Sequence, residues 1–166
     1  MGGLIMDRVI KFRGKCSKKS KYKGEWVEGG LVVPRNIKDN EVLIISAHDV
    51  DCKFTCHVDK NTVGQFTGVY DIKGKEVYEG DILKVREYRN NAINLFSEDE
   101  VMQLTYEDVK GEMTKEWVGE AIYEESCFFV GDTLFCAFHG DKRFSFPIYE
   151  IEVIGNIFDN PELLKD

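Results

Sequence analysis

Short apolar runs, each ended within a few residues by Gly, Asp or Asn, cover most of this chain and limit its fold more than any other feature. In the clearest run, Tyr149, Ile151 and Val153 alternate with glutamates, which is the period of two of a half-buried strand. Trp26–Val33 and Val42–Ile45 are rich in residues that favour strands. The pattern predicts a mainly β protein.

Other strands are expected wherever a similar run occurs. They are Val9–Arg13, Phe66–Tyr70, Lys75–Tyr78, Ile82–Arg86, Trp117–Tyr123, Cys127–Val130, Leu134–Phe138 and Phe144–Phe146. A chain of 166 residues has about the length of one domain with an appendage. We therefore expect an N-terminal β-hairpin region over residues 1–60, a main β domain over 61–159 and a short helical turn over 160–166.

Glycines punctuate the main domain at Gly64, Gly68, Gly74, Gly80 and Gly155. Such positions are typical of turns, bulges and close strand crossings, where a Cβ would clash or a positive φ is needed. Asp81 follows Gly80 and is expected to accept hydrogen bonds from amides of the turn. As an alternative, Gln65 and Thr67 could form a polar site, but we favour a structural role for this segment.

One segment has the signals of a helix. Ser97 and Glu100 have the spacing of a capping box, with acidic residues at the helix start. We predict a helix over about Glu98–Lys110, within an insertion over about residues 87–114. At the C-terminus, Asn160 followed by Pro161 predicts the start of a short helical turn.

Charge is distributed unevenly around a net value of −8. Met1–Lys23 holds eight basic residues and one acidic residue, whereas Ser97–Glu125 holds ten acidic and two basic residues. The longest stretch without a charged residue, Asn61–Tyr70, is far shorter than the ~20 residues of a membrane span. The first six residues lack the features of a signal peptide, so we expect a cytoplasmic protein.

The chemistry-bearing residues offer one metal alternative. Cys52, Cys56 and His57 are zinc-ligand types within six residues, and Cys136 with His139 could complete a set. In a strand, however, Cys56 and His57 would face opposite sides. An odd number of cysteines, five, without an export signal indicates free thiols. We expect no metal, no cofactor and no enzyme, since neither a nucleophile elbow nor a phosphate-binding glycine loop is present; a small zinc or thiol-dependent enzyme is the alternative.

Basic residues near the start form a candidate nucleic-acid surface. The residues are Lys11, Arg13, Lys15, Lys18 and Lys19, with the aromatic residues Phe12 and Tyr22 among them. Basic residues interleaved with aromatic ones are typical of single-strand binding. We favour the alternative, a solvated lysine-rich hairpin loop, and the acidic remainder of the chain opposes a phosphate backbone. We expect nucleic acid to be at most a weak partner.

Three blocks resemble the YopX family. They are IKFRGK at Ile10–Lys15, TVGQFTGVYDIKGKEVYEGDILKV at Thr62–Val85 and YEIEVIGNIFDNPELL at Tyr149–Leu164. The residues of Val42–Cys56 match the family pattern weakly, and the insertion departs from it. The family comprises proteins of unassigned molecular function encoded by phages and prophages. The resemblance implies an all-β architecture whose C-terminal part is an SH3-like small barrel, which here would carry the helical insertion.

Together these features predict a phage-type accessory protein that binds other proteins and is not an enzyme. Its partner would be an unidentified host or phage protein, and self-association stays open. The candidate partner surface is the predicted helix, through Glu100, Val101, Leu104 and Asp108, because recognition usually lies on segments inserted into a rigid scaffold. The rival interpretation is that this helix belongs to the core of the domain.

Overall fold

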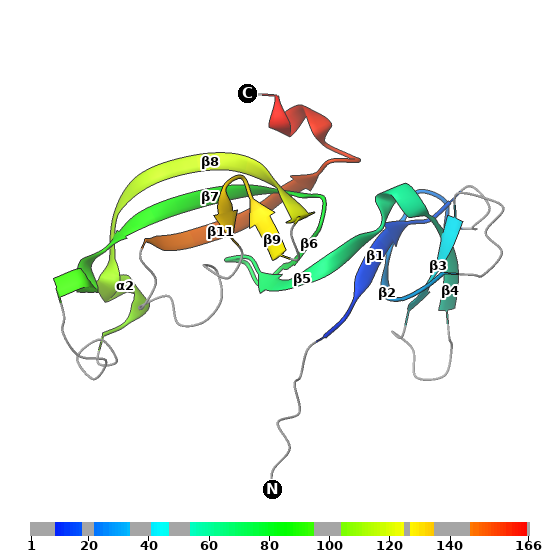
Figure 1. The fold of residues 1–166 in the computed structure, drawn as a ribbon, viewed down its shortest axis with the longest axis horizontal. Coiled ribbons are helices and arrows are strands. Elements are labelled where there is room, and N and C mark those ends of the chain that lie inside the picture. The colour runs from blue at the N-terminus through cyan, green and yellow to red at the C-terminus, as the bar shows by residue number, and fades with distance from the viewer. Residues whose placement is uncertain are drawn as a thin grey trace, which may run out of the picture. The chain divides into compact units, whose positions relative to one another are not determined.

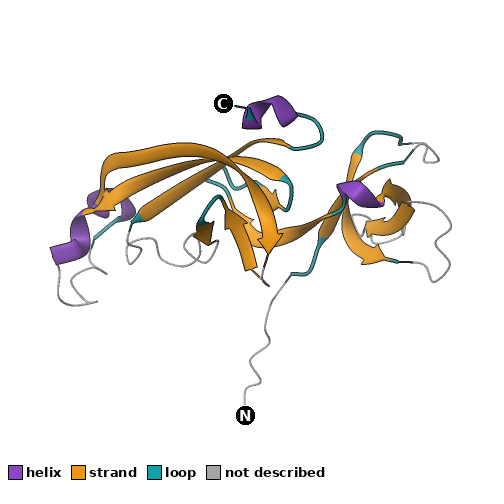
Figure 2. Ribbon diagram, turned by 45° about the horizontal axis from the view of Figure 1, so that its top comes forward, coloured by secondary structure: helices purple, strands orange, loops and turns teal. Residues whose placement is uncertain are grey.

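The structure is a computed structural model that describes residues 9–17, 22–33, 41–46, 54–94, 104–124, 127–134 and 147–165. Strands dominate these residues, and helical segments are short (Figure 2). Every strand pairing observed among them is antiparallel. The predicted mainly β class is confirmed. In the part of the chain that is described, no helix is both long and apolar enough to cross a membrane.

The chain divides into two compact units, residues 1–68 and residues 69–166. The division falls inside one strand, which runs from the first unit into the second. The first unit holds β1 (Phe12–Lys15), β2 (Trp26–Val32), β3 (Glu41–Ser46), β4 (Phe54–Asp59), the 3-10 turn η1 (Lys60–Thr62) and the start of β5 (Gly64–Tyr70). Their order across the sheet is β4-β3-β2-β1-β5.

The sheet of the first unit curls until the residue after β1 reaches β4. Cys16 forms an isolated antiparallel bridge with Val58. The curl encloses a core of Val42, Ile44, Cys56 and Val58 beside Cys16. Gly14 of β1 lies against Val58 of β4. A Cβ at Gly14 would crowd the Val58 side chain, so close packing on this face favours glycine there.

Cys16 and Cys56 form a disulfide, with their Cα atoms 6.4 Å apart. The prediction that all the cysteines are free thiols is therefore wrong for these two. The physical reason is the curl of the sheet, which brings together two residues that are 40 positions apart in the sequence. Such a pairing is a tertiary contact, and the spacing of cysteines alone does not reveal it. Cys127 is a free, exposed cysteine.

The second unit is built around three long antiparallel strands that run side by side (Figure 1). It holds the end of β5, then β6 (Glu76–Tyr78), β7 (Asp81–Asn90), η2 (Asn91–Asn94), α2 (Tyr106–Val109), β8 (Lys110–Glu124), β9 (Cys127–Val130), β10 (Thr133–Leu134), β11 (Ile148–Asn156) and η5 (Pro161–Leu164). The sheet order is β10-β9-β8-β7-β11. Within the described residues β10 and β11 are separate edge strands, so this sheet is not closed. The expected SH3-like barrel is not confirmed.

One face of this sheet carries the main core of the second unit. Leu83 and Val85 of β7 are fully buried and lie opposite Gly119 and Trp117 of β8. The cluster is completed by Val69, Val77, Ala121, Val130 and Ile151. Because side chains alternate along a strand, the residues between them face the other side of the sheet. That second face is largely polar in the middle.

The expected helical insertion over residues 87–114 is not confirmed. β7 continues to Asn90 and β8 begins at Lys110, and these two residues are paired. Both flanks therefore belong to the sheet. Apart from Tyr88 and Met113, the residues of these flanks are polar or glycine, so the sequence gives no alternating pattern there. Of the predicted helix, residues 98–103 lie outside the described residues. In the described remainder, only the four residues of α2 are α-helical.

The glycine turns support the strands of the second unit. Gly74 and Gly80 have φ angles of 78° and 79°, which side-chain-bearing residues rarely adopt. The Asp81 carboxylate, after the second turn, accepts a hydrogen bond of 2.8 Å from the amide of Tyr78 and is almost fully buried. Gly68 also has a positive φ, of 86°. Gly64 is buried at the start of β5, and Gly155 lies where the β7–β11 register shifts.

Candidate interaction surface

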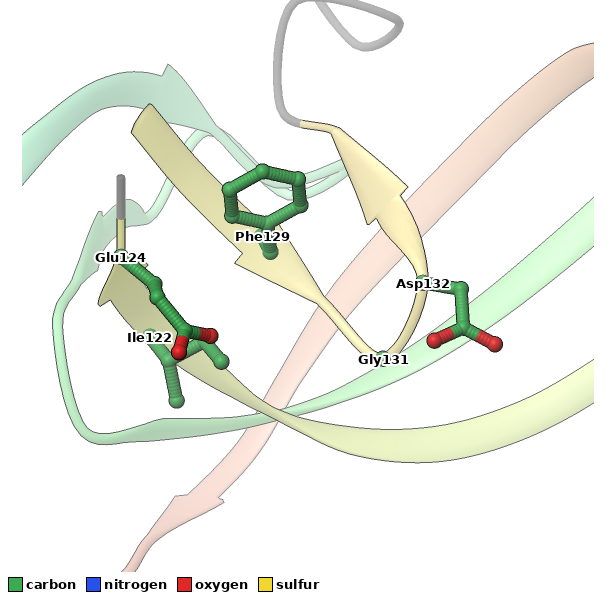
Figure 3. Close-up of a pocket in the computed structure, with 5 residues that line it drawn as sticks. All are labelled: Ile122, Glu124, Phe129, Gly131 and Asp132. Atoms are coloured by element: carbon green, nitrogen blue, oxygen red, sulfur yellow. The ribbon is translucent and has the colours of Figure 1, made fainter. Parts of the chain in front are cut away.

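A hollow lies on the outer side of β8 and β9, away from the core of the second unit. Its lining is Ile122 and Glu124 of β8, Phe129 of β9, and Gly131 and Asp132 of the turn that follows (Figure 3). We call it the β8–β9 hollow. Its volume is about 340 Å³, at the lower end of the range of known ligand pockets.

Strand pairing explains why these side chains gather there. Ala121 pairs with Val130, and both are fully buried in the core. Their neighbours Ile122 and Phe129 are also paired and must therefore point to the opposite face. Both are only half-buried. Gly131, with a φ of 57°, makes the turn that carries Asp132 to the rim.

The rim of the hollow is negatively charged. Glu124 and Asp132 are exposed, and among the described residues that line the hollow they are the ionisable ones. Among the described residues neither carboxylate forms an ion pair. The hollow therefore combines an apolar floor, from Ile122 and Phe129, with carboxylates whose charge is not neutralised by a described neighbour.

A second polar cluster centres on Glu150 of β11. Its Oε1 accepts hydrogen bonds from Lys110 Nζ at 2.7 Å and from the Tyr106 hydroxyl at 2.9 Å. Burial alone would raise the pKa of Glu150, but these bonds and one from Tyr88 outweigh it and lower that pKa. Burial and the same carboxylate raise the pKa of Tyr106. Lys110 Nζ also lies 4.2 Å from the centre of the Tyr88 ring. The cluster joins α2, β7, β8 and β11.

A ladder of ion pairs crosses the outer face of the same sheet. Arg86 of β7 contacts Glu116 of β8 at 2.9 Å and Glu152 of β11 at 3.2 Å. Lys73, from the loop after β5, also pairs with Glu152. The Lys73–Glu152 pair is partly open to solvent and contributes little stability, whereas the Arg86–Glu152 pair is more enclosed. They tie neighbouring strands together and leave no charge unmatched at these positions.

The predicted nucleic-acid residues fall partly within the described chain. Lys11, Arg13 and Lys15 lie at alternate positions and so share one face of the first unit. The Arg13 guanidinium lies 5.0 Å from the centre of the Trp26 ring, and Lys15 Nζ lies 5.9 Å from it. Lys11 pairs with Glu28 at 3.0 Å. The other two predicted residues, Lys18 and Lys19, lie outside the described residues.

The predicted partner-surface residues take part in local structure where they are described. Leu104 packs against a cluster of Ala92, Val109 and Ile148. The Asp108 carboxylate accepts hydrogen bonds from the amide and hydroxyl of Thr105, both at 2.7 Å, in a capping box that begins α2. These bonds lower the pKa of Asp108. Glu100 and Val101 lie outside the described residues.

The candidate metal ligands are not brought together. Cys56 is buried in the disulfide, while His57, the next residue of β4, is exposed and faces the other side of the strand. Within the described ranges no group of three or more possible metal ligands occurs. Cys52, Cys136 and His139 lie outside those ranges.

Sequence reasoning did not single out the β8–β9 hollow. Both strands were expected, and the Gly131-Asp132 pair between apolar runs is a turn signal. That signal locates a hairpin but does not say which of its faces carries the hollow. The face follows from the pairing of β9 with β8, which is known only from the fold.

The protein is of the mainly β class, with two units. One unit has a disulfide-linked core, and the other carries an acidic hollow. Residues 11–165 match the YopX protein family, and the chain belongs to that family. Among solved structures it is similar to protein EF1440 from Enterococcus faecalis, with 20% sequence identity and a TM-score of 0.45 over 94% of this chain and 98% of that chain. No curated protein matches it.

Proposed function

We propose that this protein is a non-enzymatic binding module that acts through protein contacts. The observation that carries the proposal is the β8–β9 hollow, where an apolar floor lies beside two carboxylates without described partners. A half-buried apolar floor with a charged rim resembles the apolar centre and polar rim of protein interfaces. A cytoplasmic accessory role in phages or prophages completes the proposal and rests on the family resemblance.

The other polar clusters support a binding role over a catalytic one. Glu150, Tyr106 and Lys110 bond to one another and join secondary-structure elements. The Arg86 and Glu152 ladder does the same between strands. In both clusters the charged groups form hydrogen bonds or ion pairs with one another across strands, as groups that stabilise a sheet do.

Affinity capture with the full-length protein tests the proposal. The tagged protein is incubated with host lysate, captured proteins are identified by mass spectrometry, and direct binding is then measured with the purified partner. We expect one host or phage protein in stoichiometric amount, with binding that weakens as salt is added. Failure to bind any purified candidate directly would contradict the proposal. So would turnover in a hydrolase or nucleotide screen that persists through purification.

Nucleic-acid association is the second candidate function, favoured by Lys11 and Lys15 on one face of the first unit, where Arg13 is buried beside Trp26. We expect such binding to be weak, without sequence preference and steeply dependent on salt, because released counterions drive it. Fluorescence anisotropy with a labelled single strand at several salt concentrations measures this. Sequence-selective binding at physiological salt would make nucleic acid the primary ligand and displace the protein-binding proposal.

A further inference from the structure

We propose that the β8–β9 hollow binds a lysine or arginine side chain of a basic segment in the partner protein. This inference rests on the proposed function and adds the chemistry of what is recognised. The occupant follows from the lining, in which Ile122 and Phe129 supply apolar surface and Glu124 and Asp132 supply negative charge (Figure 3).

The apolar floor suits the stem of a long basic side chain. Lysine and arginine carry three or four methylene groups, which pack on apolar surface while the charged end stays near water or a counter-ion. Phe129 also offers a ring edge and face, and cations bind favourably over aromatic faces. A short acidic or purely polar side chain would leave this floor uncovered.

The charge of the rim selects a cation over an anion. Glu124 lies at the end of β8 and Asp132 in the turn after β9, so the carboxylates come from two different strand ends. The unit around them adds to this preference. Residues 69–166 contain 22 acidic and 10 basic residues, a formal charge of −12. A field of this sign attracts basic segments and speeds their encounter.

A protein segment fits better than a free amine. The hollow is open at the surface, and its described lining offers a small free amine two apolar side chains and two carboxylates, with few further contacts. A protein segment adds backbone and neighbouring side-chain contacts around the hollow, and single exposed ion pairs give little affinity without them.

Nuclear magnetic resonance titration tests the site with a defined probe. The probe is a short peptide, capped at both ends, with two lysines separated by serine and glycine. Its controls are the same peptide with acetylated lysines, and spermidine as a free amine. We expect the lysine peptide to shift the amide signals of Phe129, Gly131 and Asp132. The acetylated peptide should leave these signals in place, and spermidine should bind at least fivefold more weakly than the lysine peptide.

A charge-matched pair of variants separates the site from general electrostatics. In Glu124→Gln/Asp132→Asn the rim is neutralised, and in Glu112→Gln/Glu162→Gln two exposed carboxylates elsewhere in the same unit are removed. We expect the first variant to weaken peptide binding about five- to tenfold and the second to change it less than about twofold. The dispersed amide spectrum of each variant reports whether it is folded.

Three results would overturn the inference. They are equal peptide affinity of the rim variant and the wild type, peptide-induced shifts confined to amides outside the hollow, and spermidine binding as tight as the peptide. The proposed function is judged separately with the captured partner. If the rim variant binds that partner as tightly as the wild type, the hollow is not the site although the protein is still a binding module.

Discussion

Asp71 shows how much one carboxylate contributes to the second unit. Its Oδ1 accepts hydrogen bonds from the amides of Lys73 and Lys75, both at 2.8 Å, and its Oδ2 accepts one of 3.1 Å from the amide of Val153. Burial would raise the pKa of Asp71, but these amides together lower it below its ordinary 3.8. The residue fastens the hairpin loop after β5 to the middle of β11.

Replacement of Asp71 by Asn should lower the free energy of unfolding by about 1–3 kcal/mol near neutral pH, because the amide NH₂ cannot accept a hydrogen bond. A carboxyl whose pKa is lower in the folded than in the unfolded state stabilises the fold at pH values above its unfolded-state pKa. That stabilisation is lost as the pH falls through the folded-state pKa. The wild type should therefore lose stability below about pH 4 more steeply than the variant. Urea unfolding across this range measures the difference. Parallel pH profiles for the two proteins would contradict the assignment.

Gly155 is required by a close approach at the end of β11. A Cβ at this position would lie 2.8 Å from Oδ1 of Asn160 and 2.9 Å from Cδ1 of Leu163. Gly155→Ala should therefore displace the C-terminal turn and lower the free energy of unfolding by about 1–3 kcal/mol. Gly30→Ala is the matched control in a strand, since nothing lies within 4 Å of its Cβ position. Equal melting temperatures for both variants would show that the turn does not pack on β11.

At the scale of elements, most strands were predictable, but β4 and the ends of several other strands were not. β2, β3, β9 and β11 match runs of β-formers or alternating residues, since burial of one face imposes a period of two. The end of β7 and the start of β8 contain few apolar residues besides Tyr88 and Met113 and give no such signal. The helix signal was ambiguous for a related reason. Both Ser97 and Thr105 have an acidic residue three positions later, and the described capping box is that of Thr105.

α2 is held to the second sheet by Val109, which is fully buried beside Ala92 and Ile148. Val109→Ala should lower the free energy of unfolding by about 1–3 kcal/mol, because it removes two buried methyl groups and leaves a cavity. Val118→Ala on β8 is the control. Val118 is 40% exposed. Its replacement by Ala should change the free energy of unfolding by less than about 0.5 kcal/mol.

Chemical denaturation of these two variants decides between core and recognition roles for this segment. A larger loss for Val109→Ala means that α2 belongs to the fold of the second unit. If both variants are as stable as the wild type, residues 104–109 are free to serve as a recognition segment, as the sequence suggested. The sequence alone could not identify the β8–β9 hollow, rather than this segment, as the partner surface. Both are acidic, and only the strand pairing in the fold distinguishes them.

At the scale of the whole molecule, charge and core are both divided between the two units. Residues 1–68 contain 12 basic and 8 acidic residues, a formal charge of +4, against −12 for residues 69–166. The sequence revealed this asymmetry, since counting charges needs no fold. The division between the units falls within β5, a continuous strand whose composition does not change there.

Separate cores predict separate responses to mutation. Val58 is buried with Ile44 and Cys56 in the first unit, whereas Val85 is buried with Leu83 in the second. Because these clusters share no residue, each unit has its own apolar source of stability and can open locally without the other. Val58→Ala should speed hydrogen exchange of amides in β2–β4 by about tenfold or more, the effect of at least ~1.4 kcal/mol.

The same variant should leave exchange in β7 and β8 nearly unchanged, and Val85→Ala should show the opposite pattern. Native-state hydrogen exchange followed by mass spectrometry compares the two variants peptide by peptide. β5 is the sensitive element in this experiment. Its first residues pair with β1, while Val69 packs in the second core, so it should respond to both variants. If either variant instead speeds exchange equally throughout the chain, the two units unfold as one cooperative body, and the divided cores do not confer independent stability.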